Sequence, residues 1–290
     1  MKIINTFVLN NKYKNTMRTS FLRKTMIAVM ITVSAVSATA QEKVMKILAV
    51  GNSFSRDAVE QYLWDLADAD GEKCIIGNLY IGGCPISRHA DNARNDAPAY
   101  EYRKIGADGI RVQTDNKRLD EALREEQWDV VTVQQASYDS GNYDSFSLLP
   151  ELVAYIRARV PSYTKVLFHQ TWAYAQTSNH SGFRRYGNDQ MTMYRAISEC
   201  SAKAARDNNL QGIIPAGTAI QIARSTELGD NLNVDGYHLD HLVGRYIAAC
   251  TWYEYIFKRK VRGNIFAPAG MTKKQKRLSQ KSAHTACCKD

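Results

Sequence analysis

The sequence predicts an α/β protein, a three-layer αβα sandwich around a central, mostly parallel five-stranded sheet. Short apolar runs alternate along residues 41–270 with segments whose apolar residues recur at helical spacing. The apolar runs are continuous and do not alternate with polar residues, which is typical of parallel strands buried on both faces. Strands that alternate with helices in this way predict a sheet with helices packed on either side.

Each element follows from its local pattern. Five apolar runs predict the strands, at residues 45–50, 73–81, 129–134, 165–169 and 211–216. Helical periodicity predicts helices at residues 56–69, 117–127, 148–159, 189–208 and 239–257. Residues 100–114 hold Ala107, Asp108 and Gly109 between two alternating segments, which predicts a hairpin insertion. Thr272 is a candidate N-cap for a final short helix.

The formal net charge of +9 belongs to the ends of the chain and not to its body. Of the 290 residues, the first 40 contribute +6, the last 20 contribute +5, and residues 41–270 come to −2. A body without excess positive charge argues against a nucleic-acid partner. We therefore expect one domain at 41–270 and a basic C-terminal helix or tail at 271–290.

Residues 17–40 have the three parts of a secretory signal peptide: basic side chains, then a short apolar run, then Ala-Thr-Ala. We predict cleavage after Ala40 and a secreted or periplasmic protein, with residues 1–16 as an upstream extension if Met17, and not Met1, is the true start. The apolar run is too short to span a bilayer, and no 18-residue apolar run follows it. We therefore expect no stable membrane insertion.

The 6 cysteines all follow residue 40, where export permits disulfides. No C-x-x-C occurs, so a zinc site or a thioredoxin-like motif has no support. Pairing of Cys74 with Cys84 is one option that the sequence does not decide. We expect no metal and no other cofactor.

Polar residues that follow the strands are the first candidates for function, because ligands bind at the carboxyl ends of parallel strands. The first strand is followed by Gly-Asn-Ser-Phe-Ser, which predicts Ser53 at a strand-to-helix junction where N–H groups can face a ligand. The second is followed by Gly82 and Gly83, whose backbone can approach a ligand closely. A simple N-cap and a simple turn are the alternatives for these two segments.

The third strand ends in Gln134 and Gln135, and amides at the exit of a buried strand need partners. One of them could donate to an oxyanion, or both could cap neighbouring loops. Directly before the predicted helix at 239–257, Asp235-x-x-His238 lets the carboxylate reach its own histidine and fix the ring tautomer. A metal site formed by His238 and His241 is the alternative, although no third histidine or thiolate motif accompanies it.

The order of these segments resembles the SGNH-hydrolase (GDSL-like) superfamily, over about residues 45–257. The likeness is to a branch of secreted bacterial proteins with Gly-Asn-Ser-Phe-Ser and Asp-Gly-Tyr-His-Leu motifs. It implies a flavodoxin-like SGNH fold and a catalytic triad of Ser53, His238 and Asp235.

The resemblance also implies an oxyanion hole. The N–H groups of Ser53 and Gly83 and the amide of Gln134 would form it, with Gly82 and Gln135 as alternates. Two features depart from the family pattern, since the usual Gly-Asp-Ser is Gly-Asn-Ser here and the usual Gly-x-Asn-Asp block is Gln-Gln. The second is similar to the Gln-Gly-Glu block of carbohydrate acetylesterases in the same superfamily.

The resemblance thus implies a serine esterase that hydrolyses O-acyl esters, above all O-acetyl esters on carbohydrates, with a small-molecule or glycan ester as its partner. Candidate residues of the substrate pocket are Asn52, Tyr138, His169 and Trp172. A non-catalytic glycan-binding protein on the same fold and a metal-dependent hydrolase are the alternatives. The sequence does not set the acyl group, the alcohol or the oligomeric state.

Overall fold

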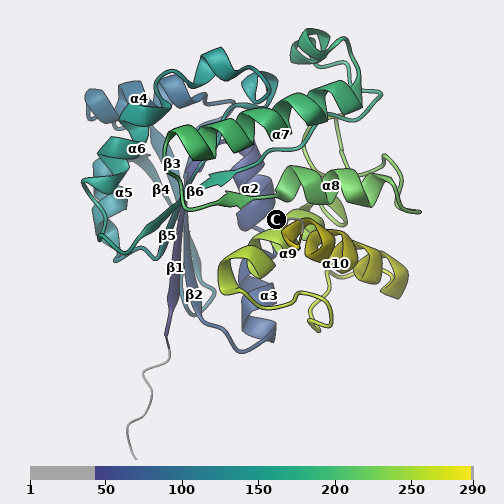
Figure 1. Cartoon of the computed structure of the whole chain (residues 1–290). Helices are drawn as coiled ribbons and strands as arrows, with labels where there is room; N and C mark the ends of the chain where they lie inside the picture. Colours follow the sequence, from purple (N-terminus) through teal and green to yellow (C-terminus); the bar gives the residue numbers. More distant parts are fainter. Residues whose placement is uncertain (1–42, 289–290) are drawn as a thin grey trace, which may run out of the picture. The chain divides into compact units, whose positions relative to one another are not determined.

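The computed structural model describes residues 43–288 (Figure 1). The predicted upstream extension, the signal peptide and its cleavage site lie outside the described residues. Seven strands form one sheet in the order β4-β3-β2-β1-β5-β6-β7. No helix among residues 43–288 is both long enough and apolar enough to cross a membrane.

The predicted α/β architecture with a mostly parallel sheet is confirmed. The five parallel strands are β1 (Met45–Gly51), β2 (Cys74–Tyr80), β5 (Val130–Val133), β6 (Lys165–His169) and β7 (Ile213–Ile214). From β1, the sheet grows in one direction through β2 and in the opposite direction through β5, β6 and β7 in turn. Such a reversal leaves a crevice between β1 and its neighbour β5 at their carboxyl ends, where open α/β sheets bind ligands.

The number of strands was predicted wrongly, because the hairpin joins the sheet. Strands β3 (Tyr100–Ile105) and β4 (Arg111–Lys117) are antiparallel, and β3 pairs with the otherwise open edge of β2. An unpaired edge presents free N–H and C=O groups, and the hairpin covers that edge of β2. The sheet therefore has seven strands and not five.

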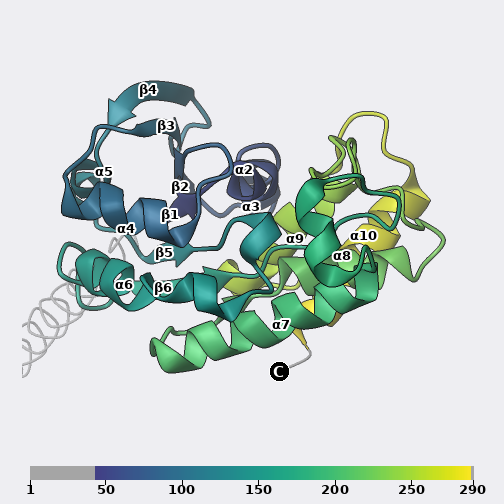
Figure 2. The same ribbon diagram turned by 90° about the horizontal axis from the view of Figure 1, so that it is seen from above.

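Helices cover both faces of the sheet, because successive side chains of β1 point to opposite sides. Ile47 and Ala49 belong to one hydrophobic core, and Leu48 and Val50 belong to the other. The first core is closed by α2 (Ser53–Val59), α3 (Leu63–Ala69), α8 (Ala216–Arg224), α9 (Gly244–Phe257) and α10 (Lys273–Cys287). The second is closed by α4 (Ile86–Arg94), α5 (Leu119–Glu125) and α6 (Leu149–Arg157). Figures 1 and 2 show these two groups on opposite sides of the strands.

The longest helix, α7 (Gln190–Asp207), contributes Met193 and Ile197 to the first core and Cys200 and Ala204 to the second. Three short 3₁₀ helices complete the described elements: η1 (Ser137–Asp139), η2 (Tyr143–Phe146) and η3 (Ser181–Tyr186).

Several helix boundaries differ from the prediction. The expected helix at 56–69 is two helices, α2 and α3, interrupted before Tyr62, whose ring packs against Tyr246 and Phe266. Helices α4 and α8 were not predicted. Helix α9 begins at Gly244 instead of Leu239, because the Asp240 carboxylate accepts the N–H groups of Leu242, Val243 and Gly244. His241, which was expected inside this helix, therefore lies in the turn before it.

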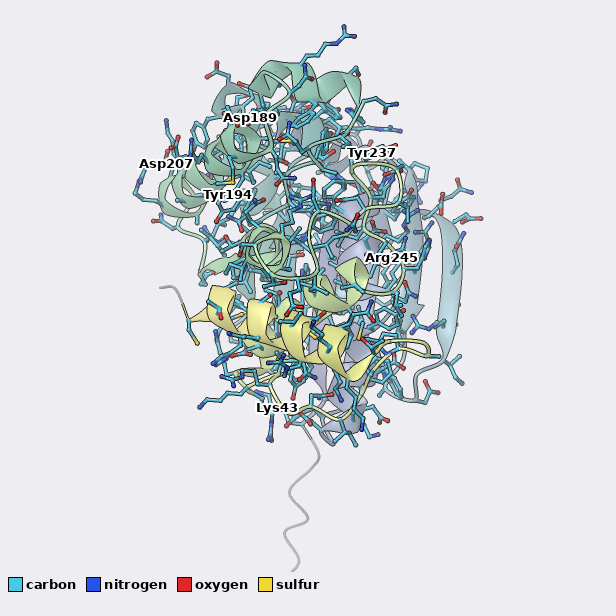
Figure 3. The ribbon with its side chains drawn as sticks, turned by 90° about the vertical axis from the view of Figure 1, so that its right-hand side faces the viewer. Lys43, Asp189, Tyr194, Asp207, Tyr237 and Arg245 are labelled. Atoms are coloured by element: carbon cyan, nitrogen blue, oxygen red, sulfur yellow. The ribbon has the colours of Figure 1, made fainter. Side chains whose placement is uncertain are left out.

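The basic C-terminal segment forms α10, whose N-cap is Thr272 as predicted. The Thr272 hydroxyl accepts the Gln275 N–H, and the Gln275 side chain accepts the Thr272 N–H. Helix α10 packs against α8 and α9 and buries Ala283 and Ala286 in the first core. Figure 3 looks onto the side of the molecule that α10 covers.

Candidate active site

Ser53 lies at the carboxyl end of β1, as the first residue of α2. The preceding Asn52 is the N-cap, and its Oδ1 accepts the Phe54 N–H at 3.0 Å. Gly51 is required in this turn, because a Cβ there would lie 2.5 Å from the Ser55 Oγ. The Ser53 side chain is thus held at the first turn of a helix, where backbone N–H groups lack intrahelical partners.

Ser53, His238 and Asp235 form one chain of hydrogen bonds. The Ser53 Oγ lies 2.8 Å from the His238 Nε2, and the His238 Nδ1 lies 2.6 Å from the Asp235 Oδ2. Partial burial raises the pKa of the Asp235 carboxyl, but hydrogen bonds from His238 and from the Tyr237 N–H outweigh burial and hold this pKa below its usual value. The carboxylate is therefore charged at neutral pH and can orient the imidazole with Nδ1 protonated.

The loop that carries His238 is fixed on both sides. We call residues 233–239 the histidine loop. An isolated bridge joins Asn233 to Leu239, and the Val234 N–H donates to the His238 carbonyl at 3.0 Å. Buried Trp172 donates its Nε1–H to the Tyr237 carbonyl at 2.8 Å. These contacts restrict the position of the imidazole relative to Ser53.

Asp57 is a positioning residue that the sequence analysis missed. Its side chain is 0% exposed, and its Oδ2 accepts the Leu239 N–H at 2.9 Å, directly after His238. Its Oδ1 pairs with the Arg245 guanidinium at 2.8 Å. Burial raises the pKa of this carboxyl, and the neighbouring Arg245 and Arg56 oppose that rise. The only signal in the sequence was an acid on the apolar side of a predicted helix.

The glycine pair lies in an exposed turn between β2 and α4. Gly83 has φ +60, and a Cβ built there would meet nothing within 4 Å. The Asn52 Nδ2 donates to the Cys84 carbonyl at 3.1 Å, which ties this turn to the residue before Ser53. Gly83 therefore stands in open space beside the β1–α2 junction, whereas a Cβ at Gly82 would lie 3.4 Å from the Tyr80 hydroxyl.

The two glutamines have different surroundings. Gln134 is buried, donates its Nε2 to the Asn52 Oδ1 at 2.7 Å and accepts from the His169 Nδ1 at 2.7 Å. One hydrogen of the Gln134 amide remains for another acceptor. Gln135 is occupied at both ends, since its Oε1 accepts the N–H of Ile86 and its Nε2 donates to Ser145. Of the two, only Gln134 is bonded to a residue of the Ser53 turn.

The four candidate residues of the substrate pocket differ in how far their side chains are buried. Asn52, His169 and Trp172 are 1%, 0% and 0% exposed, so they support the site from within. Burial lowers the pKa of His169 to about 3, and the ring stays neutral at physiological pH. Tyr138 is half-buried, and its hydroxyl donates to the Gly83 carbonyl at 3.4 Å. Tyr138 is therefore the candidate that reaches the surface beside the glycine turn.

The alternative metal site of His238 and His241 has no support in this geometry. Both nitrogens of His238 are engaged by Ser53 and Asp235, and His241 is exposed. Within residues 43–288, the one group of three possible ligand side chains is Glu254, His284 and Cys288, which contains no member of the hydrogen-bond chain.

Fold and site together define an α/β protein with a serine, histidine and aspartate in hydrogen-bond contact at the carboxyl edge of its parallel strands. The chain belongs to the family described as "Domain of unknown function (DUF4886)", whose model matches residues 46–286. A DUF4886 family protein from Bacteroides uniformis is 51% identical in a match covering 84% of this chain and 95% of that one, with a TM-score of 0.83.

Less similar structures also match. One, from Slackia heliotrinireducens and described as a candidate SGNH hydrolase, is 21% identical, covers 73% of this chain and 98% of its own, and has a TM-score of 0.48. An acetylxylan esterase from Geobacillus stearothermophilus is 12% identical, covers 73% and 94%, and has a TM-score of 0.48. A search of curated proteins gave no match.

Proposed function

We propose that this protein is a serine hydrolase that cleaves O-acyl esters through an acyl-enzyme. The observation that carries the proposal is the hydrogen-bond chain from Ser53 Oγ through His238 to Asp235, with contacts of 2.8 and 2.6 Å. A serine, a base within hydrogen-bond reach and a third group that orients the base are the parts that nucleophilic catalysis requires.

In the first step the Ser53 Oγ attacks the acyl carbonyl carbon while the His238 Nε2 takes the hydroxyl proton. The C–O bond to the alcohol then breaks, and His238 returns the proton to the leaving oxygen. In the second step, water loses its proton to His238 and attacks the acyl group, and Ser53 leaves as the free hydroxyl. Asp235 stabilises the imidazolium in both steps without taking the proton.

We propose that the N–H groups of Ser53 and Gly83 donate hydrogen bonds to the oxyanion that forms when Ser53 attacks. The open surroundings of Gly83 leave room for a substrate carbonyl, and the first turn of α2 supplies N–H groups of favourable polarity. The remaining hydrogen of the Gln134 amide is the candidate for a third donor, with its other hydrogen bonded to Asn52. Gly82 stays the alternate for Gly83.

For the substrate we propose O-acetyl groups on carbohydrates, with the reaction placed outside the cytoplasm by the predicted signal peptide. The choice of acetyl as the acyl group is supported by the similarity of Gln134-Gln135 to the Gln-Gly-Glu block of carbohydrate acetylesterases. The choice of a carbohydrate is supported by the half-buried rings of Tyr138 and Tyr237, because each adjoins the site and can stack on a sugar face. We propose no cofactor.

The test compares the wild type with Ser53→Ala, using p-nitrophenyl acetate and a fluorophosphonate label. Ser55→Ala is the neighbouring control, because the Ser55 Oγ is hydrogen-bonded to Asn78 and to the Asn52 carbonyl and takes no part in the hydrogen-bond chain from Ser53 to Asp235. We expect Ser53→Ala to lose labelling and turnover while it keeps its melting temperature, and Ser55→Ala to keep labelling. Turnover by Ser53→Ala at the wild-type rate contradicts the proposal.

The same label separates the non-catalytic alternative. A glycan-binding protein on this fold has no need of an activated serine, so its Ser53 reacts no faster than an ordinary hydroxyl. Stoichiometric labelling that requires both Ser53 and His238 favours the hydrolase.

A further inference from the structure

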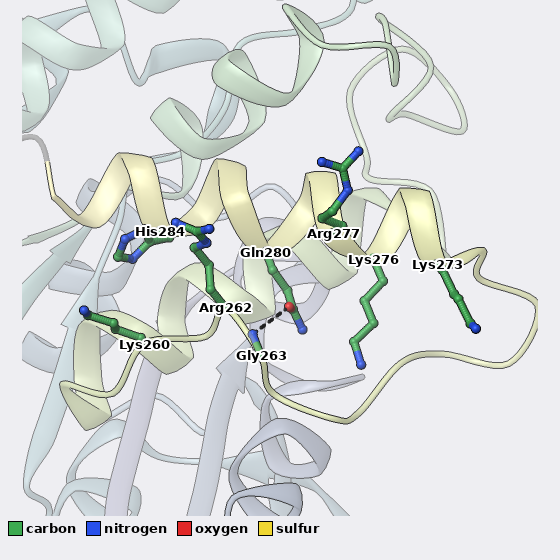
Figure 4. Close-up of a pocket in the computed structure, with 8 residues that line it drawn as sticks. All are labelled: Lys260, Arg262, Gly263, Lys273, Lys276, Arg277, Gln280 and His284. Carbon is green, nitrogen blue, oxygen red and sulfur yellow. Dashed lines mark hydrogen bonds between the residues drawn. The ribbon is translucent and has the colours of Figure 1, made fainter.

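A separate hollow lies between α10 and the segment that follows α9 (Figure 4). Its volume is about 540 Å³, within the range of ligand sites. We call it the basic pocket, and it is lined by Lys260, Arg262, Gly263, Lys273, Lys276, Arg277, Gln280 and His284. Five of these residues are Lys or Arg, none is acidic, and none belongs to the Ser53 site.

The walls of the basic pocket are fixed by hydrogen bonds. Five lining residues lie within α10 from Lys273 to His284, at helical spacing. The facing wall is the segment 260–263. The Gln280 Oε1 accepts the Gly263 N–H at 3.1 Å, which is the dashed contact in Figure 4, and the Val261 N–H donates to buried Glu254 at 2.9 Å. The pocket is therefore a built feature of the fold.

The lysines and arginines of the pocket have no carboxylate partner among the described residues, whereas His284 contacts the Glu254 carboxylate at 2.6 Å. Within residues 43–288, Lys260, Arg262, Lys273 and Arg277 have no carboxylate partner, and the Lys276 Nζ donates only to the Ile265 carbonyl, at 2.7 Å. Two of the cations next to them in sequence, Arg259 and Lys274, are different.

Arg259 pairs with Glu72, and Lys274 pairs with Glu227. These two flanking cations are thus paired with carboxylates, and the lysines and arginines of the pocket are not. Like charges that are gathered without a partner repel each other, and a bound anion removes that repulsion.

The arrangement of the charges fits an extended ligand better than a compact one. The lining residues of α10 span 11 positions, which is about 16 Å at 1.5 Å per residue. In Figure 4, Lys260 and Lys273 stand at opposite ends of the row, with Arg262 and Lys276 between them. A single phosphate would contact only part of this row.

Gln280 does not hold a ligand in the middle of the row, because its amide is already bonded to Gly263, Asn264 and Tyr246. No Phe, Tyr or Trp lines the pocket, whereas single-stranded nucleic acids are bound by stacking bases on such rings.

We propose that the basic pocket binds an acidic polysaccharide, through several of its carboxylate or sulfate groups at once. The ligand is held by charge at points along the row. This binding does not depend on the reaction proposed for Ser53, since none of the residues that carry it belongs to the hydrogen-bond chain.

Dextran sulfate and polygalacturonate are the probes, and neutral dextran is the negative control. The pocket variant is Lys260→Gln/Arg262→Gln/Lys276→Gln. The matched control is Arg259→Gln/Lys274→Gln/Lys281→Gln, which removes the same charge from neighbouring positions outside the pocket. Binding to the immobilised polymers is measured at low and high salt, and circular dichroism and melting verify that each variant is folded.

We expect the wild type and Ser53→Ala to bind at least one acidic polymer, with affinity that falls as salt rises. The pocket variant should bind about tenfold or more weakly, and the matched control should stay within about twofold of the wild type. If the triple variant does not fold, Arg262→Gln alone replaces it, because the Arg262 side chain is exposed and unpaired.

Three results overturn the proposal: equal binding by the pocket variant and the wild type, binding of neutral dextran as tightly as of the charged polymers, or no binding of any polymer. Tighter binding of duplex DNA than of both acidic polymers overturns the choice of a polysaccharide. Loss of binding in Ser53→Ala contradicts the separation of this pocket from the proposed active site.

Discussion

Replacement of Asp57 tests how the histidine loop is held. In Asp57→Ala the Arg245 guanidinium, whose side chain is 12% exposed, loses its carboxylate partner at 2.8 Å, and the buried Leu239 N–H loses its acceptor. Removal of one partner from a buried ion pair costs about 3–5 kcal/mol. That is a large part of a total folding stability of about 5–15 kcal/mol.

The direction of the Asp57 pKa sharpens the expectation. Because burial raises this pKa above its unfolded value, ionising the Asp57 carboxyl is less favourable in the folded state than in the unfolded chain. The Asp57–Arg245 pair therefore adds less to the free energy of unfolding than is lost when only one of its two members is removed. Removing both in Asp57→Ala/Arg245→Met should cost less than the sum of the single changes, with a coupling of about 0.5–3 kcal/mol.

Urea unfolding followed by tryptophan fluorescence measures these differences, since Trp172 and Trp252 are buried. Turnover is measured in parallel, and we expect it to fall because Leu239 directly follows His238. A stability loss below about 1 kcal/mol in Asp57→Ala, or strictly additive single changes, would refute the reasoning.

Further outcomes follow from the same geometry. Gly51→Ala places a Cβ 2.5 Å from the Ser55 Oγ and 3.1 Å from Gln134. We therefore expect urea unfolding to show a free energy of unfolding lower by about 1–3 kcal/mol. An unchanged free energy of unfolding would contradict this expectation. Burial lowers the pKa values of His89 and His169 to about 3, so the unfolded chain binds more protons below pH 6.5 and stability falls as pH decreases, by about 1.4 kcal/mol per pH unit for each histidine. A His89→Asn/His169→Asn variant should show a flatter dependence of urea midpoint on pH. Asp235→Asn removes the charged acceptor of the His238 Nδ1–H and should lower kcat by about 10⁴-fold with the fold intact, whereas near-wild-type turnover would exclude the role assigned to Asp235.

The sequence predicted those parts of the fold that depend on local pattern. Continuous apolar runs identified all five parallel strands, and β6 was placed at its observed bounds, because buried strands require apolar side chains on both faces. The pairing of β3 with the edge of β2 is a contact between segments separated along the chain, and no local pattern encodes it. The sequence therefore showed the hairpin but not its place in the sheet.

Helix boundaries failed where side chains contact distant residues. The break between α2 and α3 frees Tyr62 to donate to the His241 carbonyl at 2.6 Å, across 179 positions. The late start of α9 depends on the Asp240 carboxylate, which periodicity cannot reveal. Short helices such as α4 and α8 are similarly hard to predict, because packing and not propensity stabilises them.

In the candidate site, residue types pointed to the groups that are in contact, but not to the groups that support them. Ser53, Asp235 and His238 were singled out because their motifs follow strands, and the structure places them in hydrogen-bond contact. Asn52, His169 and Trp172 were expected to face a substrate, and they are buried. A polar residue after a strand can point inward or outward, and only the packing decides which.

The amides of Asn52 and Gln134 are best understood as one unit. They stand at the ends of two neighbouring strands and are bonded to each other at 2.7 Å. An aspartate at position 52 could accept from Gln134 but could not donate to the Cys84 carbonyl, which the Asn52 Nδ2 does at 3.1 Å. The contact continues to His169, whose Nδ1 donates to the Gln134 Oε1, and burial keeps that ring neutral. Neutral amides at both positions therefore link β5 and β6 to the β1–α2 turn without a buried charge next to Ser53.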